Sequence, residues 1–315
     1  MRRSTFVAAT VALAAGPSRG LAQTLTPIRI SLFPGETSAQ VYYAKELGFF
    51  AKNGLDATVT ELRNGAASAA AVAGGSTDIG FSNGLSLAQG HERGVPFTIL
   101  APAALSVAGK GTNAILVVAK TSPIRTGKDL DGKTIAIDVV GGFPQIAVRT
   151  WIDKNGGDSS TAKFVEFGYP EMIPGVNSGR IDAAAINTAF DPLLGKPDDP
   201  VHMLGSAYDA VSPHFASSMW FAMSDWATKN PDVVRRFDLT MKQAAVWGNS
   251  HPHESAVIVA DHIKQPVAEI EAANRAIYGT DMTPDLMQPV IDASAKYGSL
   301  KSAFPARDLI FTLPK

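Results

Sequence analysis

Short strand-like segments alternate with helix-like segments along the first part of this 315-residue chain, and this alternation constrains the fold more than any other feature. The first unit has predicted strands at residues 28–33, 57–62 and 78–81, a predicted helix from residue 39 and another at 66–73. Strands that are separated by helices pair in parallel, and those helices cover both faces of their sheet. The sequence therefore predicts an α/β fold.

A second unit of the same kind follows. Residues 115–119 (ILVVA) and 134–140 (TIAIDVV) are predicted strands. The pair Gly141-Gly142 then turns into a helix that carries Ile146 and Trp151 on its apolar face.

A faint internal repeat relates the two units. Lys52–Asp56 is similar to Lys154–Asp158, and Gly75–Asp78 is similar to Gly179–Asp182. An Asn follows each of the latter segments by five residues, at positions 83 and 187. The repeat predicts two α/β lobes of similar construction.

The last third of the chain is predicted to be helical, and we expect it to pack on the first lobe. A helix begins at Pro231, directly after the N-cap residue Asn230. Further helices are predicted at 252–264, 266–278 and 284–297. The predicted domains are a signal peptide at 1–22, a discontinuous lobe I at 27–110 and 217–315, and lobe II at 111–216.

The N-terminus has the order of features of a secretory signal peptide. Two arginines precede the apolar run 6–15, and small residues provide a cleavage site after Ala22 or Gln23. The apolar run is too short to span a bilayer. We therefore expect cleavage of this segment and export to the periplasm, by the general or the twin-arginine route.

The composition excludes several classes of function. The chain has 28 basic and 29 acidic residues, whereas a nucleic-acid binder needs a surplus of Lys and Arg. It has no cysteine, which excludes a disulfide framework, a thiolate zinc site, a cysteine nucleophile and a lipid-anchored lipoprotein.

Several segments, in order, resemble a known family. Residues 44–50 (AKELGFF), 53–56 (NGLD), 75–80 (GSTDIG) and 94–97 (GVPF) resemble the solute-binding proteins of nitrate, sulfonate and taurine ABC importers, a family similar to the NMT1-like domain. The stretch 122–136 resembles the entry to the second lobe of the same family.

This resemblance implies a type II periplasmic binding protein fold, in which two α/β lobes are joined by two crossover strands and hold the ligand between them. It implies a receptor that closes by hinge motion on one small solute and delivers it to a membrane permease with its ATPase subunit. It implies neither a cofactor nor catalysis. We expect a monomer that binds no nucleic acid and no metal.

The turns after the predicted strands are the candidate ligand-binding segments. Open α/β sheets bind ligands beyond the carboxyl ends of their strands, where helix N-termini offer N–H groups and the positive end of the helix dipole. Two lobes would bring both sets of turns to one cleft. The candidate ligand-binding residues are Pro34, Gly35, Glu36, Thr37, Arg63, Asn64, Ser82, Asn83, Gly141, Gly142, Phe143, Asn187, Thr188 and Phe190.

Asn83 and Asn187 are the leading candidates, because they occupy matched places in the two units and carry both donors and an acceptor. Ser82 and Thr188 lie beside them, with hydroxyls suited to oxyanion or carboxylate oxygens. Helix capping and turn formation are the alternative roles for residues of these types.

The remaining candidates also have two roles each. Gly141 and its neighbour Gly142 let a backbone approach a ligand closely, and Phe143 and Phe190 fit either stacking on a ligand or core packing. Arg63 would pair with an anion and Glu36 with an amine, although both also fit ordinary solvated side chains.

The expected ligand is an anion, either a sulfonate, nitrate or a carboxylate, and a pyrimidine-binding member of the same fold is an alternative. A serine hydrolase is a further alternative, because Gly80–Gly84 matches G-x-S-x-G with Ser82 as nucleophile. No H-G-G-G oxyanion motif precedes that segment. An enzymatic role like that of a pyrimidine-synthesising relative with this fold lacks support, because the chain has no cysteine. His251-x-His253 matches no zinc-binding pattern.

Overall fold

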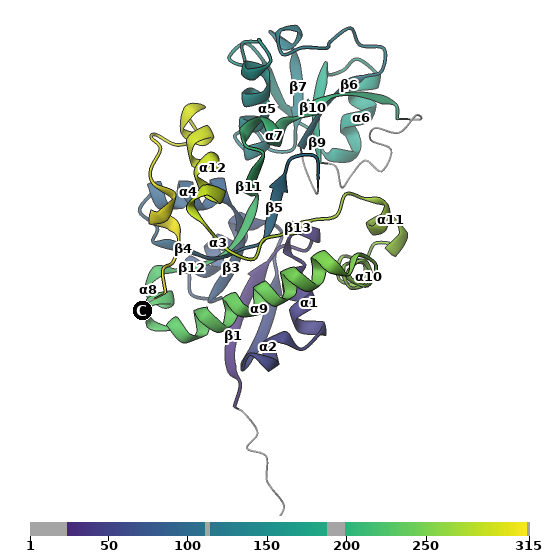
Figure 1. Cartoon of the computed structure of the whole chain (residues 1–315). Coiled ribbons are helices and arrows are strands. Elements are labelled where there is room, and N and C mark those ends of the chain that lie inside the picture. The colour runs from purple at the N-terminus through teal and green to yellow at the C-terminus, as the bar shows by residue number, and fades with distance from the viewer. Residues whose placement is uncertain (1–23, 111–113, 188–198, 314–315) are drawn as a thin grey trace, which may run out of the picture.

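The computed structural model describes residues 24–110, 114–187 and 199–313, and these form two five-stranded sheets and one three-stranded sheet (Figure 1). The predicted signal peptide, residues 1–22, lies outside the described residues. Within the described ranges no helix is both long and apolar enough to cross a membrane.

The first sheet fills the lower half of the molecule in Figure 1 and has the strand order β2-β1-β3-β12-β4. β1 is parallel to β2 and β3, whereas β12 is antiparallel to β3 and β4. Its strands are β1 (Thr26–Leu32), β2 (Leu55–Glu61), β3 (Ile79–Asn83), β4 (Phe97–Pro102) and β12 (Ser218–Met223). The helical segments between them are η1 (Glu36–Ser38), α1 (Gln40–Glu46), α2 (Phe49–Lys52), α3 (Gly65–Ala73) and α4 (Gly84–Glu92).

The second sheet fills the upper half and has the order β10-β6-β9-β7-β8. β7 is parallel to β8 and β9, and β6 is antiparallel to β9 and β10. Its strands are β6 (Ala114–Ala119), β7 (Thr134–Ile137), β8 (Lys163–Glu166), β9 (Ala183–Asn187) and β10 (Val201–Ser206). Its helices are η2 (Lys128–Leu130), α5 (Phe143–Lys154), α6 (Tyr169–Asn177) and α7 (Ala207–Val211).

Two short strands carry the chain between the halves. β5 (Ala104–Val107) leads out of the lower half, and β11 (His214–Ala216) leads back. The two strands pair antiparallel, and β13 (Ile277–Tyr278) joins β5 on its other side. β5 and β11 thus link the two five-stranded sheets.

The internal repeat corresponds to matched hydrogen bonds. Oδ2 of Asp78 accepts the backbone N–H of Arg29 in β1 at 2.9 Å, and Oδ2 of Asp182 accepts the backbone N–H of Thr134 in β7 at 2.8 Å. The turn glycines before them, Gly75 and Gly179, have φ angles of +70° and +71°, a region that glycine adopts without strain. The two parallel units therefore share one local construction.

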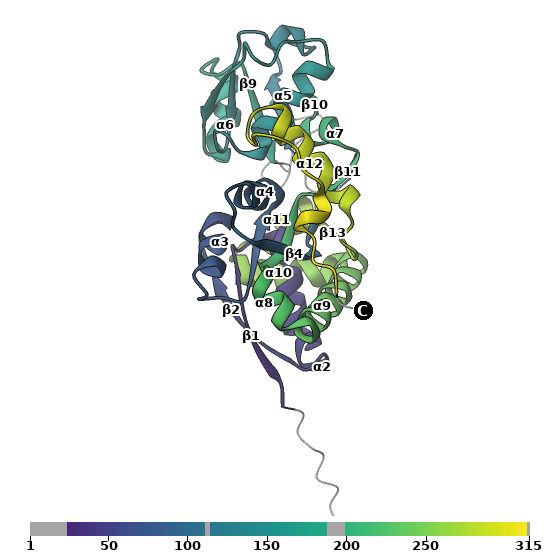
Figure 2. The same ribbon diagram turned by 90° about the vertical axis from the view of Figure 1, so that its left-hand side faces the viewer.

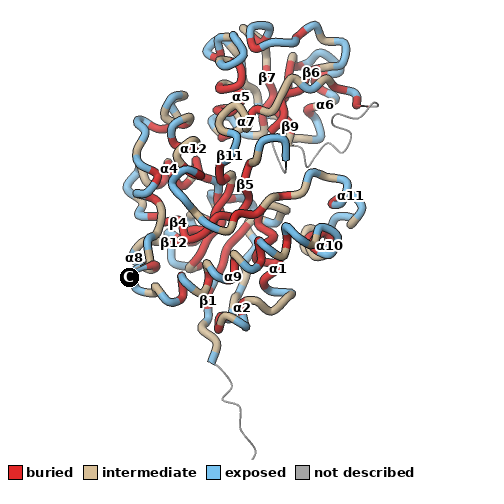
Figure 3. Tube along the Cα trace, in the orientation of Figure 1, coloured by how far each residue is buried: buried red, intermediate tan, exposed pale blue. Residues whose placement is uncertain are grey.

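The core of the lower half lies between the sheet and its helices, where Figure 3 shows the buried segments. Trp220 of β12 packs between Phe81 and Phe237, tilted to the first ring and edge-on to the second, with ring centroids 5.0 and 6.0 Å apart. Phe237 belongs to the buried face of the long helix α9, which also carries Val233 and Met241 as the sequence predicts.

The C-terminal helices differ from the prediction in one place. Residues 266–278 are predicted as one helix, but α11 ends early and Tyr278 belongs to strand β13. Tertiary contacts override the local pattern, because Tyr278 pairs with Ala104 of the crossover strand β5 and is buried. The remaining segments are α8 (Ser224–Lys229), α9 (Pro231–Ser250), α10 (Pro252–Ile263), α11 (Val267–Ala272), α12 (Pro284–Lys296) and η4 (Ala306–Leu309).

Helix α12 connects the two halves through packing. It contacts α4 in the lower half and α5 in the upper half, and it also lies against β11 (Figure 2). The buried cluster around it includes Met287 of α12, Phe143 of α5 and Phe215 of β11.

Candidate functional site

Asn83 and Asn187 lie where the chain crosses between the two sheets. Asn83 ends β3 opposite Ser218, the first residue of β12 after the return crossover. Asn187 ends β9 opposite Ala114, the first residue of β6 after the outward crossover. Because each crossover leads into the neighbouring strand, the carboxyl ends of β3 and β9 both border the region between the sheets.

The two candidate asparagines of the lower half, Asn64 and Asn83, cap helices. Oδ1 of Asn64 accepts the N–H of Ala67 at 2.9 Å, and Oδ1 of Asn83 accepts the N–H of Ser86 at 2.9 Å. Capping engages only the side-chain oxygen, so each exposed amide keeps its Nδ2 donor for a ligand. Arg63 is exposed at the same end of the sheet.

Glu36 is mostly buried and ion-paired, so it is not the ordinary solvated side chain that is one of the two roles its residue type fits. Its side chain is 13% exposed, and its Oε1 accepts from Nε of Arg275 at 2.7 Å. Burial raises the pKa of the Glu36 carboxyl above its ordinary value, and the pairing with Arg275 opposes that shift. The Glu36 carbonyl also accepts from the Tyr278 hydroxyl at 2.6 Å.

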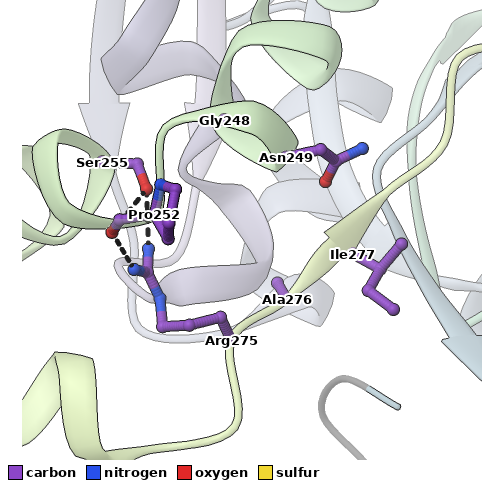
Figure 4. Close-up of a pocket in the computed structure, with 7 residues that line it drawn as sticks. All are labelled: Gly248, Asn249, Pro252, Ser255, Arg275, Ala276 and Ile277. Atoms are coloured by element: carbon purple, nitrogen blue, oxygen red, sulfur yellow. Dashed lines mark hydrogen bonds between the residues drawn. The ribbon is translucent and has the colours of Figure 1, made fainter.

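Arg275 borders a pocket of about 330 Å³ beside this ion pair (Figure 4). Its Nη1 donates to the carbonyl of Pro252 at 2.6 Å and its Nη2 to the hydroxyl of Ser255 at 3.1 Å. All three guanidinium nitrogens thus have acceptors, and Arg275 thereby connects the loop after β1 to the start of α10. The pocket lining is Gly248, Asn249, Pro252, Ser255, Arg275, Ala276 and Ile277.

The rest of the first loop lies at the carboxyl end of β1. Pro34 is exposed, and Gly35 and Thr37 are half-buried. Gly35 has an extended φ of 166°, which residues other than glycine also adopt. The loop thus stays on the surface while Glu36 and the buried Ser38 fix it to the protein.

Ser82 does not have the geometry of a nucleophile. It lies inside strand β3, opposite Met219, and is fully buried. Its hydroxyl has no hydrogen-bond partner among the described residues, so no general base contacts it. Gly65 covers it, because a Cβ at position 65 would lie 2.8 Å from the Ser82 hydroxyl oxygen.

In the upper half, strand β7 ends at Ile137, earlier than the predicted strand 134–140. The loop that follows leads to α5, with Gly141 exposed at φ +80° and Gly142 as the N-cap residue. Phe143 is buried against Tyr208 and Phe215, with ring centroids 5.5 Å apart in both pairs. Phe143 therefore packs in the core, the second of the two roles that its residue type fits.

Asp138 is a site candidate that the sequence reasoning missed. The predicted strand 134–140 runs through this residue, so the sequence pattern does not mark it as the end of a strand. Its Oδ1 is buried and has no hydrogen-bond partner among the described residues. An acidic residue within an apolar strand of the α/β type is the signal that points to such a position.

Asn187 ends β9 and is half-buried. Thr188 and Phe190, the other two candidates on this segment, lie outside the described residues.

Metal-binding clusters are absent from the described ranges, in which no group of three His, Cys, Asp or Glu side chains converges. His251 contacts the carbonyl of Trp247, and His253 pairs with Glu271.

Comparison with family models assigns the chain to a family. The family model described as NMT1/THI5 like matches residues 36–255, more than half of the chain. The chain belongs to this family. The sequence of this NMT1/THI5-like chain is 24% identical to that of a binding protein of Brucella abortus (strain 2308), over 98% of this chain and 97% of that protein.

Further similarities extend over most of the NMT1/THI5-like chain. It is 23% identical to the formylaminopyrimidine-binding protein of Halalkalibacterium halodurans, over 85% of this chain and 88% of that protein. The crystal structure of the periplasmic aliphatic sulphonate-binding protein SsuA from Escherichia coli matches with a TM-score of 0.72 and 16% identity, over 92% of this chain and 93% of that one. The predicted type II periplasmic binding protein fold is confirmed.

Proposed function

We propose that the protein is the solute receptor of an ABC importer and captures one small molecule between its two lobes. Lobe I comprises residues 27–110 and 217–315, and lobe II comprises residues 111–216. These boundaries adjoin the crossover strands β5 and β11. The family membership supports a solute-binding role.

The observation that carries the proposal is the position of Asn83 and Asn187. Each ends a strand beside a crossover, at register positions Asn83↔Ser218 and Asn187↔Ala114. A solute between the lobes would therefore meet strand ends and helix N-termini from both of them. Lobe closure would bury it and remove competing water.

The hinge of this receptor is the pair of crossover strands. β5 and β11 pair over only three positions, from His214↔Val107 to Ala216↔Leu105. Hinges of this kind need backbone changes at only a few residues. Contacts of α12 with α5 would open or rearrange as the lobes move.

In this proposal residues 1–22 are a cleaved export signal, and the receptor acts in the periplasm. The partners are a membrane permease and its ATPase subunit, and the receptor acts as a monomer. The relatives named for sulphonate and formylaminopyrimidine indicate that this fold serves both anionic and heterocyclic ligands.

Titration calorimetry on the purified mature protein tests this function with four solute classes: sulfonates, carboxylates, nitrate and pyrimidines. We expect saturable binding of one solute per chain, and recovery of that solute unchanged after release. Conversion of the solute, or labelling of Ser82 by a fluorophosphonate, would contradict the receptor and favour the hydrolase. The Ser82→Ala variant controls for labelling at any other position.

A further inference from the structure

A buried carboxyl oxygen without a donor stands at the carboxyl end of the central parallel strand of the upper sheet. This atom is Oδ1 of Asp138, which directly follows β7. β7 lies between β8 and β9, so Asp138 occupies the middle of the row of strand ends. A buried acceptor without a partner costs free energy that an incoming donor recovers.

Two tyrosine side chains, Tyr169 and Tyr208, lie near this carboxyl. Tyr169, the first residue of α6, hydrogen-bonds with Asp138, and burial together with the Asp138 charge raises the pKa of the Tyr169 hydroxyl. Burial and the same carboxyl also raise the pKa of Tyr208. Oδ1 of Asp138 is buried beside these side chains, and a hydrogen bond to a buried acceptor is stronger than one in water.

The loop that leads into α5 already pairs three of its N–H groups with acceptors of the protein. Oε1 of Glu166 accepts the N–H of Val140 at 2.8 Å, and Oε1 of Gln145 accepts the N–H of Gly141 at 2.7 Å. The N–H of Gly142 donates to the carbonyl of Val139 at 3.0 Å. An anion that approached the N–H of Val140 would have to displace the Glu166 carboxylate and would be repelled by it.

The same loop has an apolar surface. Val139 and Val140 are 53% and 50% exposed, among the largest exposed fractions of any large hydrophobic residue in the described chain. Exposed apolar side chains beside a polar anchor are typical of ligand-contacting surfaces.

We infer that the solute presents an N–H donor, as an amine, an amidine or an amino-substituted heterocycle does, to Oδ1 of Asp138, with its apolar part against Val139 and Val140. This inference rests on the proposed function and assigns its substrate class. Oε1 of Glu36, by contrast, already accepts from Nε of Arg275.

Thermal-shift measurements with two probe sets test the substrate class. One set bears N–H donors and no anionic group: benzamidine, benzylamine, agmatine and 4-aminopyrimidine. The other set is anionic and lacks N–H groups: nitrate, methanesulfonate, benzenesulfonate and benzoate. We expect stabilisation by members of the first set, and calorimetry then gives the affinity of the best of them.

Two matched variants assign the effect to Asp138. Asp138→Asn preserves the size of the side chain and replaces one acceptor oxygen by a donor, so we expect affinity for the donor-bearing probe to fall about tenfold or more. Asp56→Asn makes the same chemical change on an exposed residue near the amino end of β2, and its affinity should equal that of the parent protein. Unchanged melting behaviour of Asp138→Asn without solute shows that the variant is folded.

The outcomes separate the two proposals. Stabilisation by anions alone, or full affinity in Asp138→Asn, overturns the inference and leaves the receptor function intact. A protein that none of the solutes in either test stabilises or binds contradicts the receptor function and the inference with it.

Discussion

The carboxyl of Glu36 and the guanidinium of Arg275 show how a pair distant in sequence holds the loop after β1. The residues are 239 positions apart, and their bond joins the loop after β1 to the segment before β13. Tyr278 strengthens the same junction through the Glu36 carbonyl. The loop that begins at Pro34 is therefore held by residues of the C-terminal region.

Replacing Arg275 by Met should lower the free energy of unfolding by about 3 kcal/mol at neutral pH, because the buried Glu36 carboxylate loses its partner. Urea unfolding monitored by circular dichroism measures the change. Arg235→Met is the matched control, since Arg235 pairs with Asp232 on the surface, and it should change stability by less than about 0.5 kcal/mol.

The loss in Arg275→Met should also depend on pH. The pKa of Glu36 is raised in the folded protein, so the folded state binds its proton more tightly than the unfolded chain. The unfavourable contribution of the carboxylate is therefore absent at low pH and grows as the pH rises through the folded pKa. A variant that loses as much stability at acidic pH as at neutral pH contradicts this explanation.

At the scale of single elements, the helix caps explain why residue types alone mislead about ligand contacts. Asn64 and Asn83 occupy turns that match a ligand-binding pattern, yet their oxygens cap α3 and α4. Because Asn is favoured both at N-caps and in binding turns, the sequence cannot distinguish the two roles.

Two substitutions of Asn83 separate these roles. Asn83→Ala should lower the unfolding free energy by about 1 kcal/mol, because the N–H of Ser86 loses its acceptor. Asn83→Asp keeps the acceptor and should preserve stability, while removing the Nδ2 donor. If Nδ2 contacts the solute, calorimetry on Asn83→Asp will show weakened binding. Equal stability of the Ala variant and the parent protein would rule out the capping role.

Strand and helix positions were predictable because alternation and repeat spacing report local structure. The equivalent aspartates Asp78 and Asp182 illustrate this, since the repeat noted in the sequence recurs as matched backbone contacts. The limits arise from contacts distant in the chain. The end of β7 before Asp138 and the strand at Tyr278 depend on neighbours that no local pattern encodes.

Over the whole molecule, the six tyrosines set the alkaline limit of stability. Burial raises the pKa of every one of them, to about 12 for Tyr43. Above about pH 10 the unfolded chain loses tyrosine protons that the folded protein keeps, so the free energy of unfolding falls as the pH rises.

We expect a loss of up to about 1.4 kcal/mol per pH unit for each fully buried tyrosine above pH 10. Tyrosinate absorbance should therefore increase in one step together with unfolding. Gradual ionisation in the folded protein, well before circular dichroism changes, would show that the hydroxyls are more accessible than the structure indicates.

Closure of the two lobes on a solute can be measured directly as a distance, because the chain has no native cysteine. Spin labels at Ala66→Cys in α3 and Glu171→Cys in α6 would occupy exposed first-turn positions on the two lobes. Pulsed electron paramagnetic resonance then reports the separation between them with and without a saturating solute. The receptor model predicts a separation that shortens by several ångströms and narrows in distribution, whereas an unchanged distribution with solute bound would contradict closure of the lobes on the ligand.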